Sequence, residues 1–188
     1  MPEKPTLEYF PHPEAEAVAD GDLNPVLPAE VRDAMLDVIL AWANLDAVTS
    51  FLAAAISGMD PDHGADSFGR KVIADKLKSM AKALKTAGQT EGVETIERIA
   101  VEYSDRAYLR KRIAHSRCTG VRVSNPDAVV FLPFEREGPP GNLAIEIFDL
   151  AKFREATDWA RAVHDHFLRI VMDGAGFFNM DHQTASPS

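Results

Sequence analysis

Cysteine is nearly absent from the sequence, and long uninterrupted apolar runs are absent altogether. Cys118 is the single cysteine among 188 residues, which excludes an internal disulfide and fits a reducing compartment. The N-terminus has no basic segment followed by an apolar run, so no secretory signal is predicted. No stretch approaches the ~18 consecutive apolar residues of a membrane span. We therefore expect a cytoplasmic protein that does not cross a membrane.

Common catalytic and cofactor-binding motifs are also missing. The sequence has no glycine-rich phosphate loop, no Gly-x-Ser-x-Gly elbow and no Cys-x-x-Cys pair. His164 and His166 are two residues apart on an expected helix, so their side chains point in different directions and do not form a metal pair. Cys118 is expected to be a small, buried or half-buried side chain. No cofactor is predicted.

An aspartate-rich segment, residues 58–67, is expected to be a loop. Its acids suggest a calcium site, but no glutamate stands at the twelfth position where a calcium loop needs its bidentate ligand. No metal is therefore expected here. The three aspartates are Asp60, Asp62 and Asp66.

Acidic residues outnumber basic ones, but one segment reverses this balance. The net charge of −9 argues against non-specific nucleic-acid binding by the whole surface. Residues 106–122 hold six cations and no acid, so this segment carries +6 and the remainder −15. Such a segment is either a solvated helix end, where cations suit the helix dipole, or a local anion site. The cations are Arg106, Arg110, Lys111, Arg112, Arg117 and Arg122.

Hydrophobic spacing predicts three long helices after a proline-rich arm. Residues 1–27 contain five prolines and are expected to form an extended arm. Helices are expected from Pro28 to a stop at Gly58, over 68–86 and over 91–116. The buried face of the second helix is expected to comprise Val72, Ile73, Leu77, Met80, Ala81 and Leu84.

The pattern then changes to two short runs rich in β-branched and aromatic residues. Residues 128–132 and 143–148 form these runs, and the Gly- and Pro-rich residues 135–142 separate them. The pattern predicts a β-hairpin over about 128–148. An isolated hairpin is only marginally stable, so we expect it to pack on the helices.

A fourth helix is expected over about 150–173, with Gly174 as its end and a flexible tail over 175–188. The predicted fold class is mainly α. It comprises an up-and-down bundle of about four long helices, with the hairpin between the third and the fourth, in one domain over 28–174.

The candidate site for chemistry is the segment 110–115, near the end of the third helix. Lys111 and Arg112 precede His115 by four and three residues, so each shares a helical face with it, and Arg110 flanks that face. Neighbouring positive charge favours a neutral imidazole that can accept a proton. An arginine can hold a phosphate and stabilise charge that grows during phosphoryl transfer. Alternatively, the histidine simply caps the last carbonyls of the helix.

The stretch Tyr-Leu-Arg-Lys-Arg-Ile-Ala-His, residues 108–115, resembles the signature of the HEPN superfamily. That signature is an arginine, a polar residue, about three variable residues and a histidine, late in a bundle of about four helices. The resemblance covers roughly residues 28–173. It matches Arg110 to the motif arginine and His115 to the motif histidine. Lys111 stands where ribonuclease members more often carry Asn, Asp or His.

The resemblance implies a metal-independent endoribonuclease of toxin–antitoxin, antiviral or RNA-processing systems. It implies a homodimer in which two motifs face one cleft, with Arg110 as phosphate binder and His115 as proton-transfer group. Other relatives bind nucleotides or serve as inactive interaction modules. The alternative function is therefore a non-catalytic interaction or regulatory module with a partner protein. Further phosphate contacts are expected from Lys111, Arg112, Arg106 and Arg117.

Overall fold

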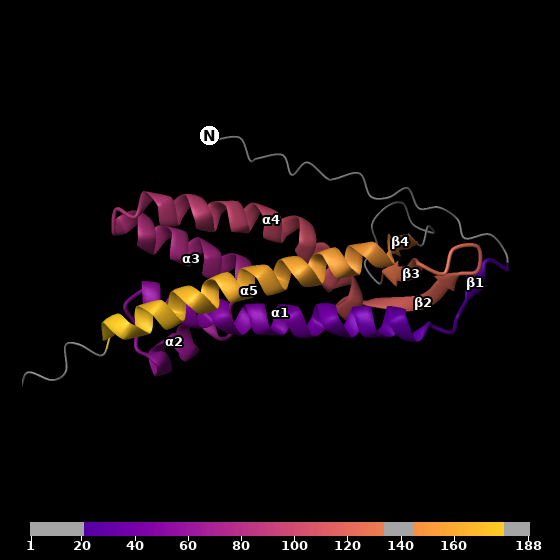
Figure 1. Ribbon diagram of the computed structural model, residues 1–188, viewed down its shortest axis with the longest axis horizontal. Coiled ribbons are helices and arrows are strands. Elements are labelled where there is room, and N and C mark those ends of the chain that lie inside the picture. Colours follow the sequence, from indigo (N-terminus) through magenta and orange to yellow (C-terminus); the bar gives the residue numbers. More distant parts are fainter. Residues whose placement is uncertain (1–20, 134–144, 179–188) are drawn as a thin grey trace, which may run out of the picture. The chain divides into compact units, whose positions relative to one another are not determined.

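The computed structural model describes residues 21–133 and 145–178 (Figure 1). Within them the chain is mainly helical with a small antiparallel sheet, which confirms the predicted mainly-α class. In chain order the elements are β1 (Leu23–Asn24), α1 (Ala29–Ile56), α2 (Pro61–Phe68), α3 (Ile73–Thr86), α4 (Thr90–His115), β2 (Ser116–Arg122), β3 (Ala128–Pro133), β4 (Glu146–Asp149) and α5 (Leu150–Phe178).

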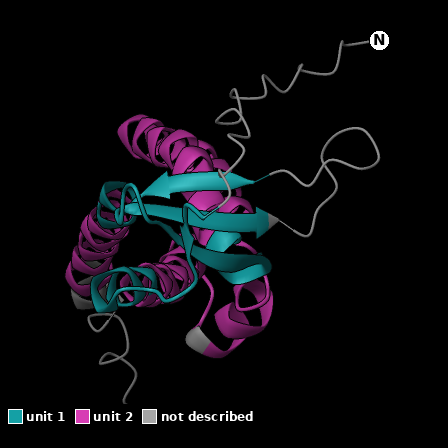
Figure 2. Cartoon of the chain, turned by 90° about the vertical axis from the view of Figure 1, so that its right-hand side faces the viewer, with its two compact units in different colours: residues 1–35, 111–154 teal, residues 36–110, 155–188 magenta. Residues whose placement is uncertain are grey.

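The chain divides into two compact units (Figure 2). Unit 1 comprises residues 1–35 and 111–154, and unit 2 comprises residues 36–110 and 155–188. Among the described residues, unit 1 holds the whole sheet with the beginnings of α1 and α5 and the end of α4, whereas unit 2 is entirely helical. The sequence patterns suggested one domain over 28–174 and gave no sign of this division.

The sheet of unit 1 has the strand order β1-β2-β3-β4, and every neighbouring pair is antiparallel. Val121 pairs with Val129 and Val130 pairs with Ile147, so β-branched side chains face one another across the strands. Phe131 is fully buried, and its ring centroid lies 6.3 Å from that of Phe153 at the start of α5. Apolar cross-strand pairs and this ring stack form the core of unit 1.

The two runs predicted to pair do lie side by side as β3 and β4, with Ala128 opposite Asp149. The turn expected over 135–142 lies outside the described residues. The sequence did not predict β1 or β2. The end of the expected N-terminal arm forms β1, whose Leu23 pairs with Arg122 of β2, and Asp22 before it accepts hydrogen bonds from the backbone N–H and the hydroxyl of Ser124.

Strand β2 contains a bulge between Cys118 and Gly120. Gly120 has φ +147°, and a Cβ atom on it would lie 2.1 Å from the carbonyl oxygen of Asn24. Only glycine lets the backbone of β2 approach β1 this closely.

In unit 2, the segment expected to be a loop contains α2, so that prediction was wrong. Asp60 caps this helix, since its carboxylate accepts hydrogen bonds from the backbone N–H groups of Asp62 and His63. Pro61 follows the cap, where its missing N–H costs nothing. The Asp-Pro pair was the available signal for a helix start.

Helix α3 begins at Ile73 and not at residue 68 as expected. Val72 is its N-cap and is 61% exposed, so its predicted burial was wrong. The buried residues of α3 are Ile73, Lys76, Leu77 and Met80.

The core of unit 2 is built around Trp42 of α1, which is buried. Its ring centroid lies 5.4 Å from that of Tyr103 on α4 and 5.6 Å from that of Trp159 on α5. The indole N–H of Trp159 donates to the Glu102 carboxylate at 2.7 Å, so α4 and α5 are also joined by a polar contact. These rings hold α1, α4 and α5 together within unit 2.

The bounds of α4 agree with the expected helix over 91–116 within one residue at each end. Helix α5 continues through Gly174 to Phe178, so the predicted stop at Gly174 was wrong. Residues 179–188 lie outside the described part of the chain.

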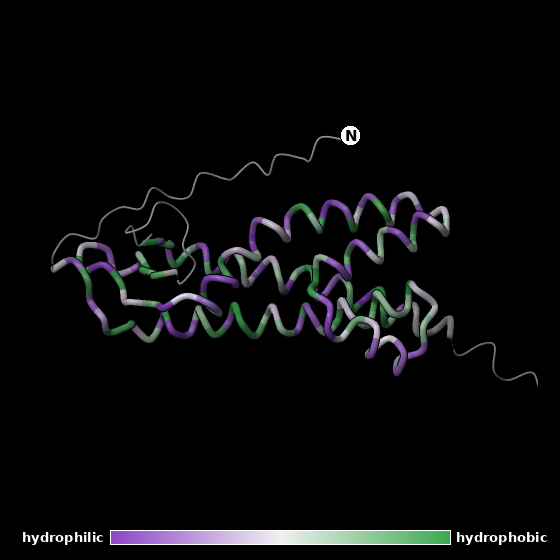
Figure 3. Tube along the Cα trace, turned by 180° about the vertical axis from the view of Figure 1, so that it is seen from behind, coloured by the Kyte–Doolittle hydropathy of each residue, from purple (hydrophilic) through white to green (hydrophobic). Residues whose placement is uncertain are grey.

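Helix α1 is long and apolar enough to cross a membrane by length and composition alone. Buried core helices of soluble proteins pass the same test, and 44% of the apolar window of α1 is buried inside the protein. Figure 3 shows the hydropathy of each residue along the described chain.

Candidate functional site

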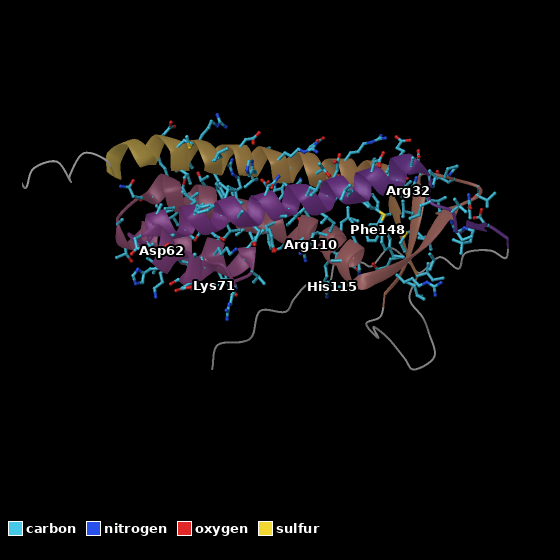
Figure 4. All side chains as sticks on the ribbon, turned by 90° about the horizontal axis from the view of Figure 1, so that it is seen from below. Arg32, Asp62, Lys71, Arg110, His115 and Phe148 are labelled. Carbon is cyan, nitrogen blue, oxygen red and sulfur yellow. The ribbon has the colours of Figure 1, made fainter. Side chains whose placement is uncertain are left out.

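The division between the two units falls inside the predicted motif. Helix α4 is continuous from Thr90 to His115, but Arg110 belongs to unit 2 and Lys111 to unit 1. Figure 4 labels Arg110 and His115 near the C-terminal end of this helix. Each side of the motif is described by itself below.

In unit 1, the last turn of α4 exposes three of its residues and buries one cation. Lys111, Ala114 and His115 are exposed to solvent. Lys111 and His115 are four residues apart, so they occupy one helical face. This exposed face is compatible with binding of an anion at His115.

Arg112 is 2% exposed, and its guanidinium Nη2 lies 2.7 Å from Oε1 of Glu146. Glu146 is the first residue of β4 and is equally buried. A charge buried this deeply must keep its partner, because an unpaired charge in the protein interior is costly. The pair joins the end of α4 to the sheet. Arg112 was expected to contact phosphate, but in this structure its guanidinium is committed to Glu146.

Strand β2 follows α4 without a linker and brings a second exposed cation close to His115. Ser116 pairs with Pro133 and Arg117 with Leu132, so the chain is already in the sheet one residue after the imidazole. Arg117 is exposed. The exposed imidazole of unit 1 thus lies between Lys111 in the chain before it and Arg117 after it.

In unit 2, Arg110 is exposed and acts electrostatically on Tyr103, two helical turns earlier. Burial raises the pKa of the Tyr103 phenol above its usual 10.0, the positive charge of Arg110 lowers it, and Asp46 and Asp75 raise it. The positive charge of Arg110 is therefore near enough to the aromatic core to act on the Tyr103 phenol.

Arg106 lies in unit 2 and is surrounded by acceptors. Its guanidinium is over the Trp159 ring at 5.4 Å, and its Nη2 atom is 3.7 Å from the Glu155 carboxylate. Its Nη1 atom also donates to the backbone carbonyl of Glu102 at 3.5 Å. A phosphate at Arg106 would have to compete with these groups.

Three cations of the basic segment, on α4 and β2, lie against carboxylates. The guanidinium of Arg106 lies 3.7 Å from the Glu155 carboxylate, and that of Arg112 lies 2.7 Å from the Glu146 carboxylate. The third guanidinium lies 3.6 Å from the carboxylate of the aspartate that precedes β1. This third pair is Arg122 with Asp22. The exposed cations of the segment are Arg110, Lys111 and Arg117.

Unit 2 also contains a buried ion pair that the sequence reading missed. Lys76 is 0% exposed, and its ammonium donates to the Asp46 carboxylate at 2.7 Å and to the Asp46 carbonyl at 3.3 Å. The signal was present in the sequence, because Lys76 stands three residues after Ile73 and four before Met80 on the buried face of α3.

Metal and thiol chemistry find little support in the described residues. In residues 21–133 and 145–178, no group of three or more His, Cys, Asp or Glu side chains is arranged to hold a metal ion. Cys118 is half-buried as expected, and burial raises the pKa of its thiol above 9.0.

Comparisons with protein-family models, curated proteins and solved structures gave no match.

Proposed function

We propose that this chain is a HEPN-like protein that binds RNA or nucleotides and cleaves RNA without a metal ion. Arg110 binds the scissile phosphate and His115 transfers protons. The proposal includes an up-and-down bundle of about four long helices, which the family resemblance implies, with a β-hairpin between the third and the fourth, and a cytoplasmic homodimer.

The observation that carries the proposal is the exposure of both motif residues on one helix. Arg110 and His115 are solvent-exposed on α4, whereas Arg112 between them is buried against Glu146. Cations and a histidine also suit the C-terminal end of a helix on structural grounds, so the support comes from exposure and the family spacing together. The exposed Lys111 and Arg117 add positive charge near His115.

The chemistry follows from the residue types. Neutral imidazole accepts the proton of the RNA 2′-hydroxyl, whose oxygen then attacks the adjacent phosphorus. The bond to the 5′-oxygen breaks, and that oxygen takes a proton from a second acid, the His115 imidazolium of the other copy in the dimer. Arg110 stabilises the charge on the phosphorane. The products are a 2′,3′-cyclic phosphate and a 5′-hydroxyl, and no metal ion takes part.

The test is RNA cleavage in the presence of EDTA. Wild type is compared with Arg110→Ala, His115→Ala and the control His63→Ala, which removes a histidine with an 81% exposed side chain on α2. We expect cleavage to fall by at least about a hundredfold in the two motif variants and to persist in the control. Equal residual activity in all four proteins would indicate a contaminating nuclease and refute the mechanism.

One observation favours a second function, a non-catalytic interaction module. Helix α1 exposes large apolar side chains, among them Leu36 and Phe51, which is typical of a binding surface. Lys111 also differs from the residue usual in ribonuclease members. This function predicts no cleavage by wild type, together with stable binding of a protein through α1.

A further inference from the structure

An apolar stripe runs along the exposed side of α1 in unit 2. Leu36, Leu40 and Phe51 are 56%, 53% and 60% exposed, and two alanines on the same face, Ala43 and Ala47, are also exposed. Steps of three and four residues keep these side chains on one helical face. The stripe consists of Leu36, Leu40, Ala43, Ala47 and Phe51.

Charge is missing from this side of the helix. Between residues 38 and 56 the single charged side chain is Asp46, which is paired with the buried Lys76. A solvated helix face normally carries charged residues, and this protein has a net charge of −9. An uncharged, apolar face more than three turns long indicates a surface that a partner covers.

The same face is already covered by a helix at its C-terminal end. Ala54 lies seven residues after Ala47 on this face and is buried. Gly64 of α2 packs against it so closely that a Cβ atom on Gly64 would lie 2.4 Å from the Ala54 Cβ. The exposed stripe therefore continues an established helix–helix interface in which small residues let two backbones approach.

We propose that the stripe binds the stripe of a second copy of this chain, with the two α1 helices antiparallel. A two-fold axis passes between Ala43 and Asn44. Leu36 then lies opposite Phe51 of the second copy, and Leu40 lies opposite its Ala47. Large side chains meet at both ends and small residues meet at the axis, so the stripe is complementary to itself, as an isologous interface requires.

Charge favours this occupant over a lipid surface. Helices that bind membranes in the interface carry lysine and arginine beside their apolar face. The charged neighbours of the stripe on α1 are Arg32, Asp33, Asp37 and Asp46, so acids outnumber the single cation, and the chain as a whole repels anionic lipid. The inference rests on the proposed function only for the existence of a homodimer, and it names the surface that forms it.

Sedimentation of the full chain over a range of micromolar concentrations tests the interface. One helix face is smaller than the ~800 Å² per partner of a standard interface, so we expect a concentration-dependent dimer. Leu40→Glu should weaken dimerisation by at least about tenfold while the circular dichroism spectrum is unchanged. The matched control is Val101→Glu, at an exposed apolar site on α4, which should dimerise like wild type. A wild-type protein that stays monomeric, or a control as weak as Leu40→Glu, overturns the proposal.

Disulfide crosslinking tests the direction of the helices. Ala43→Cys lies next to the two-fold axis and should form a linked dimer on oxidation. Leu36→Cys should not, because in an antiparallel pair the two positions are about 22 Å apart at 1.5 Å rise per residue. Wild type and Val101→Cys report the background from Cys118. Linking of Leu36→Cys as efficient as that of Ala43→Cys means parallel helices and overturns the arrangement.

Two further measurements keep the outcomes separate. Cosedimentation with phosphatidylcholine and phosphatidylserine vesicles should show no binding, and binding that Leu40→Glu abolishes would replace the second copy by a membrane. RNA cleavage assayed on the same samples distinguishes the two proposals. A Leu40-dependent dimer without RNA cleavage refutes the ribonuclease function and leaves the interface standing, whereas cleavage by a monomer refutes the interface and the acid role of His115 in the second copy.

Discussion

The guanidinium of Arg112 and the carboxylate of Glu146 lie 2.7 Å apart, and both side chains are almost completely buried within unit 1. Thirty-four positions of sequence separate them, and the pair joins the last turn of α4 to the first residue of β4. This turn also carries His115. Its position thus depends on Glu146 of β4, which lies outside the motif.

Removing the acid alone should therefore be far worse than removing the pair. Glu146→Ala leaves the Arg112 cation buried without its carboxylate, and we expect the free energy of unfolding to fall by about 3–5 kcal/mol. Arg112→Met combined with Glu146→Leu removes both charges and keeps apolar volume, so it should lie within about 1 kcal/mol of wild type. Urea denaturation measures both. A double variant as unstable as Glu146→Ala would contradict a charge effect and point to shape alone.

Gly120→Ala should destabilise the sheet strongly. The new Cβ atom must occupy the space of the Asn24 carbonyl oxygen, and the residue must also keep φ +147°. We expect a loss of more than about 3 kcal/mol, since strain at such a backbone conformation alone costs about 1–3 kcal/mol. Gly88→Ala is the matched control, because Gly88 has φ +72° with no atom within 4 Å of the added Cβ. Chemical denaturation should show a clearly smaller loss for the control, and equal losses would exclude the clash as the cause.

Tyr103 should make the protein less stable at alkaline pH. Burial raises the pKa of its phenol in the folded state, while an unfolded chain releases the proton near pH 10.0. The folded state then holds more protons than the unfolded state above pH 10, so the free energy of unfolding falls as pH rises from there through the raised pKa. Tyr103→Phe should reduce this loss in denaturation experiments between pH 9 and 12.

Arg110 provides an independent check on the same phenol. Its cation lowers the Tyr103 pKa, so Arg110→Gln should shift the tyrosine absorbance titration to higher pH than in wild type. A shift to lower pH would mean that Arg110 does not act on Tyr103.

The long helices were predictable because their apolar spacing repeats over many turns. Val38, Trp42, Leu45 and Leu52 follow one another along α1 at steps of four, three and seven residues, and all four are buried. The short α2 was not predicted, because a single turn or two of helix gives too few residues for a period. Helix α2 starts at the Asp60 cap. Because the segment is rich in aspartate, this cap was interpreted as part of a loop.

Features that depend on distant partners were not predictable in the same way. Strand β2 has no alternating pattern of its own and exists through pairing with β1 and β3. Arg112 looked like a phosphate ligand because nothing in its own helix reveals Glu146. The motif spacing from Arg110 to His115 was visible in the sequence, whereas exposure, which separates Arg112 from its neighbours, needed the fold.

The pairing of Lys76 with Asp46 has a chemical consequence. The Lys76 amine has no exposed surface, while the lysine next along on the outer side of α3, Lys78, has a 78% exposed side chain. An amine-reactive acylating reagent meets Lys78 in the native protein but reaches Lys76 only after α1 and α3 separate. The ratio of the two acylation rates, read by peptide mass spectrometry, therefore gives the free energy of that opening without any denaturant.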